Sequence, residues 1–199
     1  DITMEILSKL NSDSLNQNMI DVDNVITTIE NAVKGNVLKN PDSLKYVSPK
    51  FANDTNNYTF TTIQAAINAS GVGTLIYVYP GTYNEADTGK TGVNIYLSEG
   101  VIWQFSSTKP TFFTNGVTCT ISGEGIIGNS YTSGAQAIRI TNSSVVSIRC
   151  KVVYNYGSPN ISAYPFSGNA IYVKKSTFDL YCDKVYSRVG ISMYFDTTA

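Results

Sequence analysis

The segment TFTTIQAAINASGVGTLIYVYPGTYNE, residues 59–85, decides the fold that the sequence predicts. Its start, Thr61–Gln64, has the Thr-x-x-Gln pattern of a capping box, in which a hydroxyl and an amide bond the first backbone N–H groups of a helix. Ile63, Ala66 and Ile67 follow at the spacing of one helical face. These residues predict a short amphipathic helix.

A turn and a strand are predicted directly after this helix. Gly71 and Gly73 favour the end of the helix and a turn. The run Leu75–Tyr79 is rich in β-branched and aromatic residues, which are typical of strands, and Pro80–Gly81 predicts the next turn. Because so short a helix is stable only when it is packed, we expect it to cap an open apolar end of the strands.

The sequences TIQAAINA and LIYVYPGTYNE within this segment resemble the opening of right-handed parallel β-helix proteins of the pectate-lyase-like superfamily, in particular phage tail-spike and tail-fibre proteins. The resemblance implies a mainly β chain, in which a right-handed parallel β-helix, a solenoid, starts at residue 59 behind a short capping helix. It implies little about activity, because lyases, hydrolases, adhesins and spikes share this opening.

The second half of the chain repeats itself, which also predicts a solenoid. AIRITNSSVVSIRCKVVYN (137–155) is similar to AIYVKKSTFDLYCDKVYSR (170–188). The aligned pairs are Ile138 with Ile171, Ile148 with Leu180, Cys150 with Cys182 and Tyr154 with Tyr186. A looser copy aligns Val117, Cys119 and Ile121 with Val146, Ile148 and Cys150, 29 residues later. The alignments predict two inward ladders of stacked side chains, Ile121–Cys150–Cys182 and Cys119–Ile148–Leu180.

The residues before the capping helix are predicted to form separate parts. Residues 1–38 are predicted to be a helical segment for attachment or oligomerisation, since the apolar residues from Leu15 to Val33 form a short heptad seam. Its β-branched positions favour a homotrimer; a single amphipathic helix packed on its own chain or on a neighbour is the alternative. Residues 39–58 are predicted to be a linker in which Tyr46–Val47 and Phe51 form a brief strand. Residues 59–199 are predicted to be the start of the β-helix, which we expect to continue beyond residue 199.

Composition excludes several classes of site. The chain has 199 residues and a net charge of −1, so it lacks the basic footprint of a nucleic-acid-binding protein. No apolar run is long enough to span a bilayer. Three cysteines are an odd number, so Cys119, Cys150 and Cys182 are predicted to be buried and reduced. The absence of histidine removes the commonest general base and metal ligand.

No catalytic, cofactor-binding or metal-binding residue is predicted. Hydrolases of the resembled superfamily use clustered aspartates, and the chain has no Asp-Asp pair. Among the scattered acids, six are candidates: Glu85, Asp87, Glu99, Glu124, Asp179 and Asp183. Paired carboxylates perform acid–base chemistry on glycans, but a surface charge cluster of Asp179 and Asp183 with Lys174, Lys175 and Arg188 explains those two acids equally well. Trp103 is in phase with Val101 and Phe105 and is predicted to lie in the core. The tyrosines predicted to lie outside are Tyr77, Tyr79, Tyr172 and Tyr181.

The resemblance and the order of helix, linker and solenoid predict a structural virion protein, a component of a phage tail spike or fibre whose β-helix recognises a glycan of the host surface. The expected partners are two further copies of the chain, other virion proteins bound through residues 1–40, and host polysaccharide. One alternative is a polysaccharide depolymerase with its active site outside this segment. A secreted or cell-surface adhesin with the same fold is the other.

Overall fold

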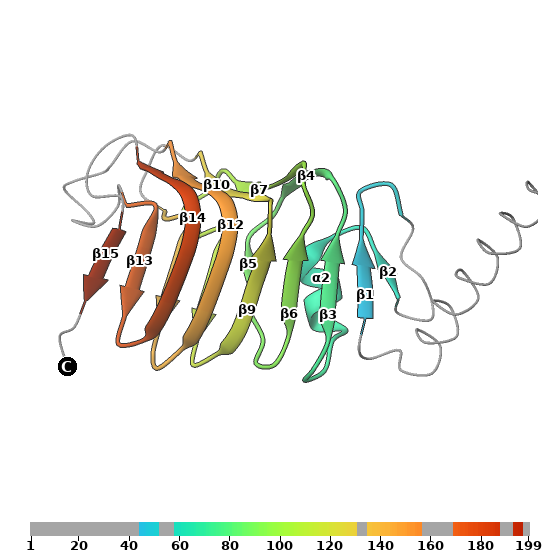
Figure 1. Ribbon diagram of the computed structural model, residues 1–199, viewed down its shortest axis with the longest axis horizontal. Helices are drawn as coiled ribbons and strands as arrows, with labels where there is room; N and C mark the ends of the chain where they lie inside the picture. Colours follow the sequence, from blue (N-terminus) through green and yellow to red (C-terminus); the bar gives the residue numbers. More distant parts are fainter. Residues whose placement is uncertain (1–43, 52–57, 131–134, 157–168, 188–192, 197–199) are drawn as a thin grey trace, which may run out of the picture. The chain divides into compact units, whose positions relative to one another are not determined.

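The computed structural model describes residues 44–51, 58–130, 135–156, 169–187 and 193–196 (Figure 1). The chain divides into two units, Asp1–Asn40 and Pro41–Ala199. The helical segment predicted for residues 1–38 lies outside the described residues, as does most of the predicted linker. Among the residues that are described, no helix is long and apolar enough to cross a membrane.

The described part is mainly β. The larger of its two sheets contains β1 Leu44–Val47, β2 Thr59–Phe60, β3 Leu75–Val78, β4 Gly81–Asn84, β6 Asn94–Leu97, β7 Val101–Phe105, β9 Thr118–Gly123, β10 Ile126–Asn129, β12 Val145–Asn155 and β14 Thr177–Ser187. The smaller sheet contains β5 Asp87–Thr88, β8 Phe112–Asn115, β11 Ile138–Thr141, β13 Ile171–Lys174 and β15 Met193–Asp196. Strand β1 includes Tyr46–Val47, as predicted, but it ends at Val47, so Phe51 is not part of it.

All strand pairings within the described residues are parallel, and they follow a repeated order. Strand β12 bends: its first half pairs with β9 and its second half with β10. The larger sheet is therefore two half-sheets that join at β12, and β14 pairs along the whole length of this bend. The chain passes from the first half-sheet (β9) to the second (β10) and then to the smaller sheet (β11), and it repeats this order at β12 and β13 (Figure 1). This arrangement is compatible with a solenoid.

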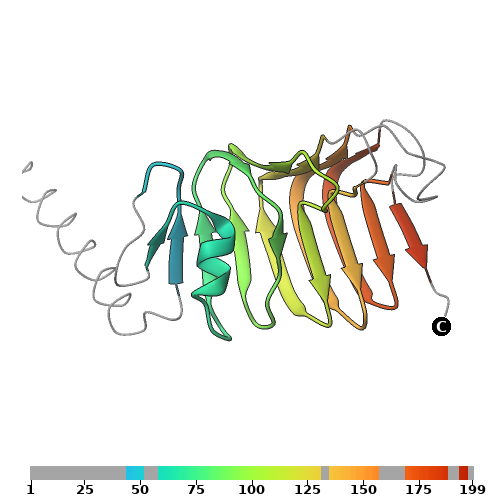
Figure 2. The same ribbon diagram turned by 180° about the vertical axis from the view of Figure 1, so that it is seen from behind.

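The predicted short helix is α2, Ile63–Asn68. Its apolar face of Ile63, Ala66 and Ile67 is buried, as expected from the spacing, and the helix contacts β1, β2, β3 and β5 (Figure 2). The capping residue is Thr62, one residue later than predicted, because it is the hydroxyl of Thr62 that accepts a hydrogen bond from the Ala65 N–H, at 3.2 Å.

A second cap on α2 comes from a residue 22 positions further along the chain. The two carboxylate oxygens of Glu85 accept hydrogen bonds from the N–H groups of Ile63, at 2.9 Å, and Gln64, at 3.1 Å. These N–H groups have no partner within the helix, and the N-terminal end of a helix favours negative charge. Glu85, one of the candidate acids, therefore ties α2 to the segment after β4.

The pairing of β12 with β14 confirms the predicted repeat. Cys150 pairs with Cys182 and Tyr154 with Tyr186, and Ile138 pairs with Ile171 in the smaller sheet. Sequence similarity alone thus aligned correctly two strands of the larger sheet, β12 and β14, and two of the smaller sheet, β11 and β13.

The looser third copy was aligned wrongly by two residues. Cys119 pairs with Val146 and Ile121 with Ile148, an offset of 27 residues rather than 29. The ladders are therefore Ile121–Ile148–Leu180 and Cys119–Val146–Phe178. Side chains alternate between the two faces of a strand, so a slip of two residues keeps the same residues inside. The alternation of apolar residues could not reveal the error.

The core lies between the half-sheets and the smaller sheet. Trp103 is fully buried, as predicted, and meets the ring of Phe112 edge-on with centroids 5.4 Å apart. The three cysteines are free thiols; Cys119 and Cys150 are buried, whereas Cys182 is half-buried. The prediction for the cysteines is thus confirmed for two of the three.

Candidate functional site

One row of side chains crosses the outer face of the smaller sheet. The strand register places Thr88, Phe113, Arg139, Tyr172 and Tyr194 side by side, one from each strand. The guanidinium carbon of Arg139 lies 5.4 Å from the ring centroid of Tyr172, and the rings of Tyr172 and Tyr194 stack at 5.7 Å with 10° between their planes. The row is a continuous stack of an arginine and two aromatic rings.

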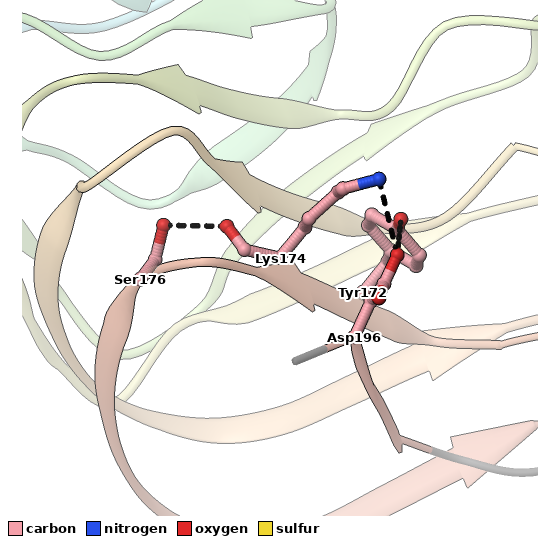
Figure 3. A network of polar contacts seen from close by, with 4 residues as sticks. All are labelled: Tyr172, Lys174, Ser176 and Asp196. Atoms are coloured by element: carbon pink, nitrogen blue, oxygen red, sulfur yellow. Dashed lines mark hydrogen bonds and ion pairs between the residues drawn. The ribbon is translucent and has the colours of Figure 1, made fainter. Parts of the chain in front are cut away.

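A second row follows two residues further along the same strands. It contains Asn115, Thr141, Lys174 and Asp196. One carboxylate oxygen of Asp196 lies 3.2 Å from the Lys174 ammonium and accepts a hydrogen bond from the Tyr172 hydroxyl, also at 3.2 Å (Figure 3). Burial raises the pKa of Tyr172, and the hydrogen bond to Asp196 and its negative charge raise it further. Asp196 therefore links the two rows and offsets the charge of Lys174.

An open groove of about 750 Å³ lies over these rows. Its floor includes Thr88, Phe113, Arg139 and Lys174, and one wall includes Lys109 from the segment between β7 and β8. Lys109 and Arg139 are exposed, and the side chain of Lys174 is 38% exposed. The groove thus brings together three cations, an aromatic ring and several neutral hydrogen-bonding groups. We call it the basic groove.

Two buried asparagines hold the loops beside this groove. Asn129 and Asn155 occupy the same register position at the ends of β10 and β12. The amide nitrogen of Asn129 donates to the Lys109 carbonyl at 3.1 Å, and that of Asn155 donates to the carbonyls of Ala135 at 2.8 Å and Asn169 at 2.9 Å. Buried carbonyls require such donors. Asn129 therefore positions the backbone of the wall that carries Lys109.

Asp87, which borders the groove, is not an available acid. It is 1% exposed, and its carboxyl lies near the Glu85 carboxylate and the Trp103 indole. Burial is the main reason that its pKa rises to about 9, and the negative charge of Glu85 adds to it. The Asp87 carboxyl is therefore neutral at pH 7. Among the described residues that line the groove there is no other acid, and Asp196 offsets Lys174 from beside it.

The other candidate acids lie on different surfaces. Glu99, Glu124, Asp179 and Asp183 are all exposed. The register places Asp183 beside Lys151, whose backbone N–H bonds the Gly125 carbonyl next to Glu124. Burial is the main cause of the raised pKa of the Cys150 thiol. The negative charges of Cys182, Asp183 and Glu124 raise that pKa further. The two carboxylates therefore flank a lysine, which favours a charged surface corner over an acid–base pair.

The surface charge cluster that was predicted around Asp179 and Asp183 does not include Lys174. Lys174 pairs with Asp196 rather than with Asp179 or Asp183. Arg188 lies outside the described residues.

The predicted outer tyrosines have different exposures. Tyr181 is 67% exposed and Tyr79 is 38% exposed, as predicted. Tyr77 is half-buried because its ring stacks on that of Tyr96, at 5.2 Å. Tyr172 lies on the outer face, as predicted, but it is only 7% exposed because its neighbours in the row, Arg139 and Tyr194, cover it.

Sequence reasoning missed Lys109, Phe113 and Arg139. The repeat aligns Arg139 with Tyr172, so it could have placed Arg139 on the outer face. Nothing local marks Lys109, because its place beside the groove depends on a loop held by Asn129.

In comparisons with known proteins, no protein-family model matches the chain, and neither a curated protein nor a solved structure matches it. The description of this site therefore rests on its geometry alone.

Proposed function

We propose that the strands within residues 59–199 form the first coils of a right-handed parallel β-helix, and that the chain is a structural component of a phage tail spike or fibre. The repeated order of the two half-sheets and the smaller sheet supports the first part, since each coil of such a solenoid pairs with the next one at about 4.8 Å. Residues 1–40 join three copies and bind other virion proteins, and the β-helix faces the host surface.

The basic groove carries the proposal that this surface binds a glycan. Saccharides present many hydroxyl groups and a few apolar ring faces, and binding sites for small ligands combine an apolar surface with a few placed polar groups. The groove offers the ring of Phe113 together with the polar side chains of Thr88, Asn115 and Arg139. All of them lie on strands, whose positions are held by the sheet. This favours recognition of a ligand by a preformed surface.

Binding of surface polysaccharides from a panel of bacteria to the full chain, measured by biolayer interferometry, tests this function. We expect Phe113→Ala to weaken binding about tenfold or more, because it removes the aromatic floor. Val145→Ala is the matched control, since Val145 is 48% exposed and lies on another sheet. Equal binding by both variants, or no binding to any polysaccharide, contradicts the proposed function. Progressive shortening of a bound polysaccharide would instead support a depolymerase.

The proposed assembly has its own test. Light scattering of the full chain should give the mass of a trimer, and a variant without residues 1–40 should give the mass of a monomer. A full chain that remains monomeric at high concentration would contradict the proposal that it forms a trimeric spike.

A further inference from the structure

The charge of the basic groove differs from that of the chain as a whole. The chain has a net charge of −1, whereas the groove is bordered by Lys109, Arg139 and Lys174. Asp87 is the one acid among the described residues that line it, and burial keeps that carboxyl neutral at pH 7. A concave surface with an excess of cations concentrates anions. The groove therefore attracts a negatively charged ligand.

The three cations are not equivalent. The guanidinium of Arg139 lies over the Tyr172 ring, 5.4 Å from its centroid, and this contact restrains it on one side. An arginine held in this way loses little entropy when it binds a carboxylate through two parallel hydrogen bonds. Lys174 is already paired with Asp196 at 3.2 Å. The side chain of Lys109 is exposed on the wall.

The rest of the lining favours a saccharide over an acidic protein segment. Thr88, Thr108 and Asn142 line the groove with hydroxyl and amide groups, and Phe113 provides a ring. A peptide partner would call for apolar pockets at an interface core, whereas these neutral polar groups suit the hydroxyls of a sugar. The combination of cations and neutral hydrogen-bonding groups fits one chemical class.

We infer that the basic groove binds an acidic polysaccharide, with a sugar carboxylate paired to Arg139 and Lys109 and with Asp196 withholding Lys174 from the ligand. This inference rests on the proposed function, because it names the class of glycan that the same groove takes. It differs from that function in requiring the carboxylate, which allows the two to fail separately.

Binding of the full chain to immobilised alginate and hyaluronan, each compared with its carboxyl-reduced form, tests the inference. The reduced forms keep the sugar hydroxyls and lose the charge. We expect the acidic forms to bind about tenfold or more tightly than their reduced forms, and Arg139→Gln to remove most of that difference. Lys50→Gln is the control, because Lys50 is an exposed cation outside the groove. Dextran sulfate serves as a polyanion without carboxylates.

Asp196→Asn provides a gain-of-affinity test. It releases Lys174 and should strengthen binding of the acidic forms several-fold. Asp179→Asn makes the same change in net charge on the exposed face of β14 and should leave binding unchanged. Circular dichroism confirms that each variant is folded.

Each outcome has one meaning. Tighter binding of the acidic forms that depends on Arg139 and not on Lys50 supports the inference. Equal binding of acidic and reduced forms overturns it and leaves the proposed function in place. Equal losses from Arg139→Gln and Lys50→Gln, or binding of dextran sulfate alone, overturn it in favour of unspecific charge attraction. No binding of any saccharide overturns both the inference and the proposed function.

Discussion

The ring of Tyr154 lies across the backbone of Gly128 on the neighbouring strand. The two residues are paired in register between β10 and β12, and a Cβ atom at Gly128 would meet the Cζ, Cε1 and Cε2 atoms of Tyr154. The Tyr154 hydroxyl reaches one strand further and donates to the side-chain oxygen of Gln104 at 2.5 Å. An aromatic ring that covers a glycine in this way protects backbone that has no side chain of its own.

This contact leads to the first prediction. Gly128→Ala should lower the free energy of unfolding by about 1–3 kcal/mol, because the added methyl group forces the Tyr154 ring to move. Urea unfolding followed by circular dichroism measures it. Gly71→Ala is the control, since nothing lies within 4 Å of a Cβ atom at Gly71.

A double-mutant cycle identifies the cause. The cost of Gly128→Ala should shrink in a Tyr154→Ala background, because the ring that it displaces is gone. Additive effects of the two substitutions would show that Gly128 is needed for another reason.

The second prediction concerns the cap that Glu85 forms on α2. Glu85→Ala should lower the free energy of unfolding by about 1–2 kcal/mol, since two N–H groups of the helix lose their acceptor. Glu99→Ala removes an equal charge from an exposed turn and should change stability little. Identical urea midpoints for the two variants would refute a capping role for Glu85.

The third prediction is a pH dependence that comes from Asp87. Its pKa rises from 3.8 to about 9 on folding, so the folded chain keeps a proton that the unfolded chain loses between these values. Stability contributed by the neutral carboxyl is therefore fully present at low pH and declines as the pH rises toward 9. Asp87→Asn should remove this decline, since the amide does not ionise.

Urea unfolding at a series of pH values between about 4 and 9 checks it. The wild-type chain should lose stability more steeply with rising pH than the Asp87→Asn variant. Curves that run parallel over this range would show that Asp87 does not hold a proton in the folded state. Asp179→Asn is the exposed control.

The fourth prediction concerns the thiols. Burial raises the pKa of Cys119 to about 11 and that of Cys150 to about 12, and it also raises the pKa of the half-buried Cys182. Because the thiolate is the reactive form and must be accessible, iodoacetamide should modify Cys182 first and the other two only on unfolding. Mass spectrometry of tryptic peptides over time measures the order. Early labelling of Cys150 in the folded chain would contradict the burial of its thiol.

Much of the fold could be predicted because its signals are local. The face formed by Ile63, Ala66 and Ile67 predicted α2, and the similarity of residues 137–155 to 170–188 predicted a pairing that the structure has. The failures occurred where two local choices look alike. Thr61 and Thr62 are both threonines able to cap a helix, and the entry direction of the chain selects the second.

The sequence by itself determined which residues face inward, because the alternation of side chains along a strand depends only on neighbouring positions. The tertiary structure alone decided the offset of 27 residues between β9 and β12, because turn lengths and backbone pairing set it. It also decided the basic groove, where Lys109, Arg139 and Lys174 meet although they are far apart in sequence. Only the stacking of strands, with Asn129 holding the wall, places those three charges together.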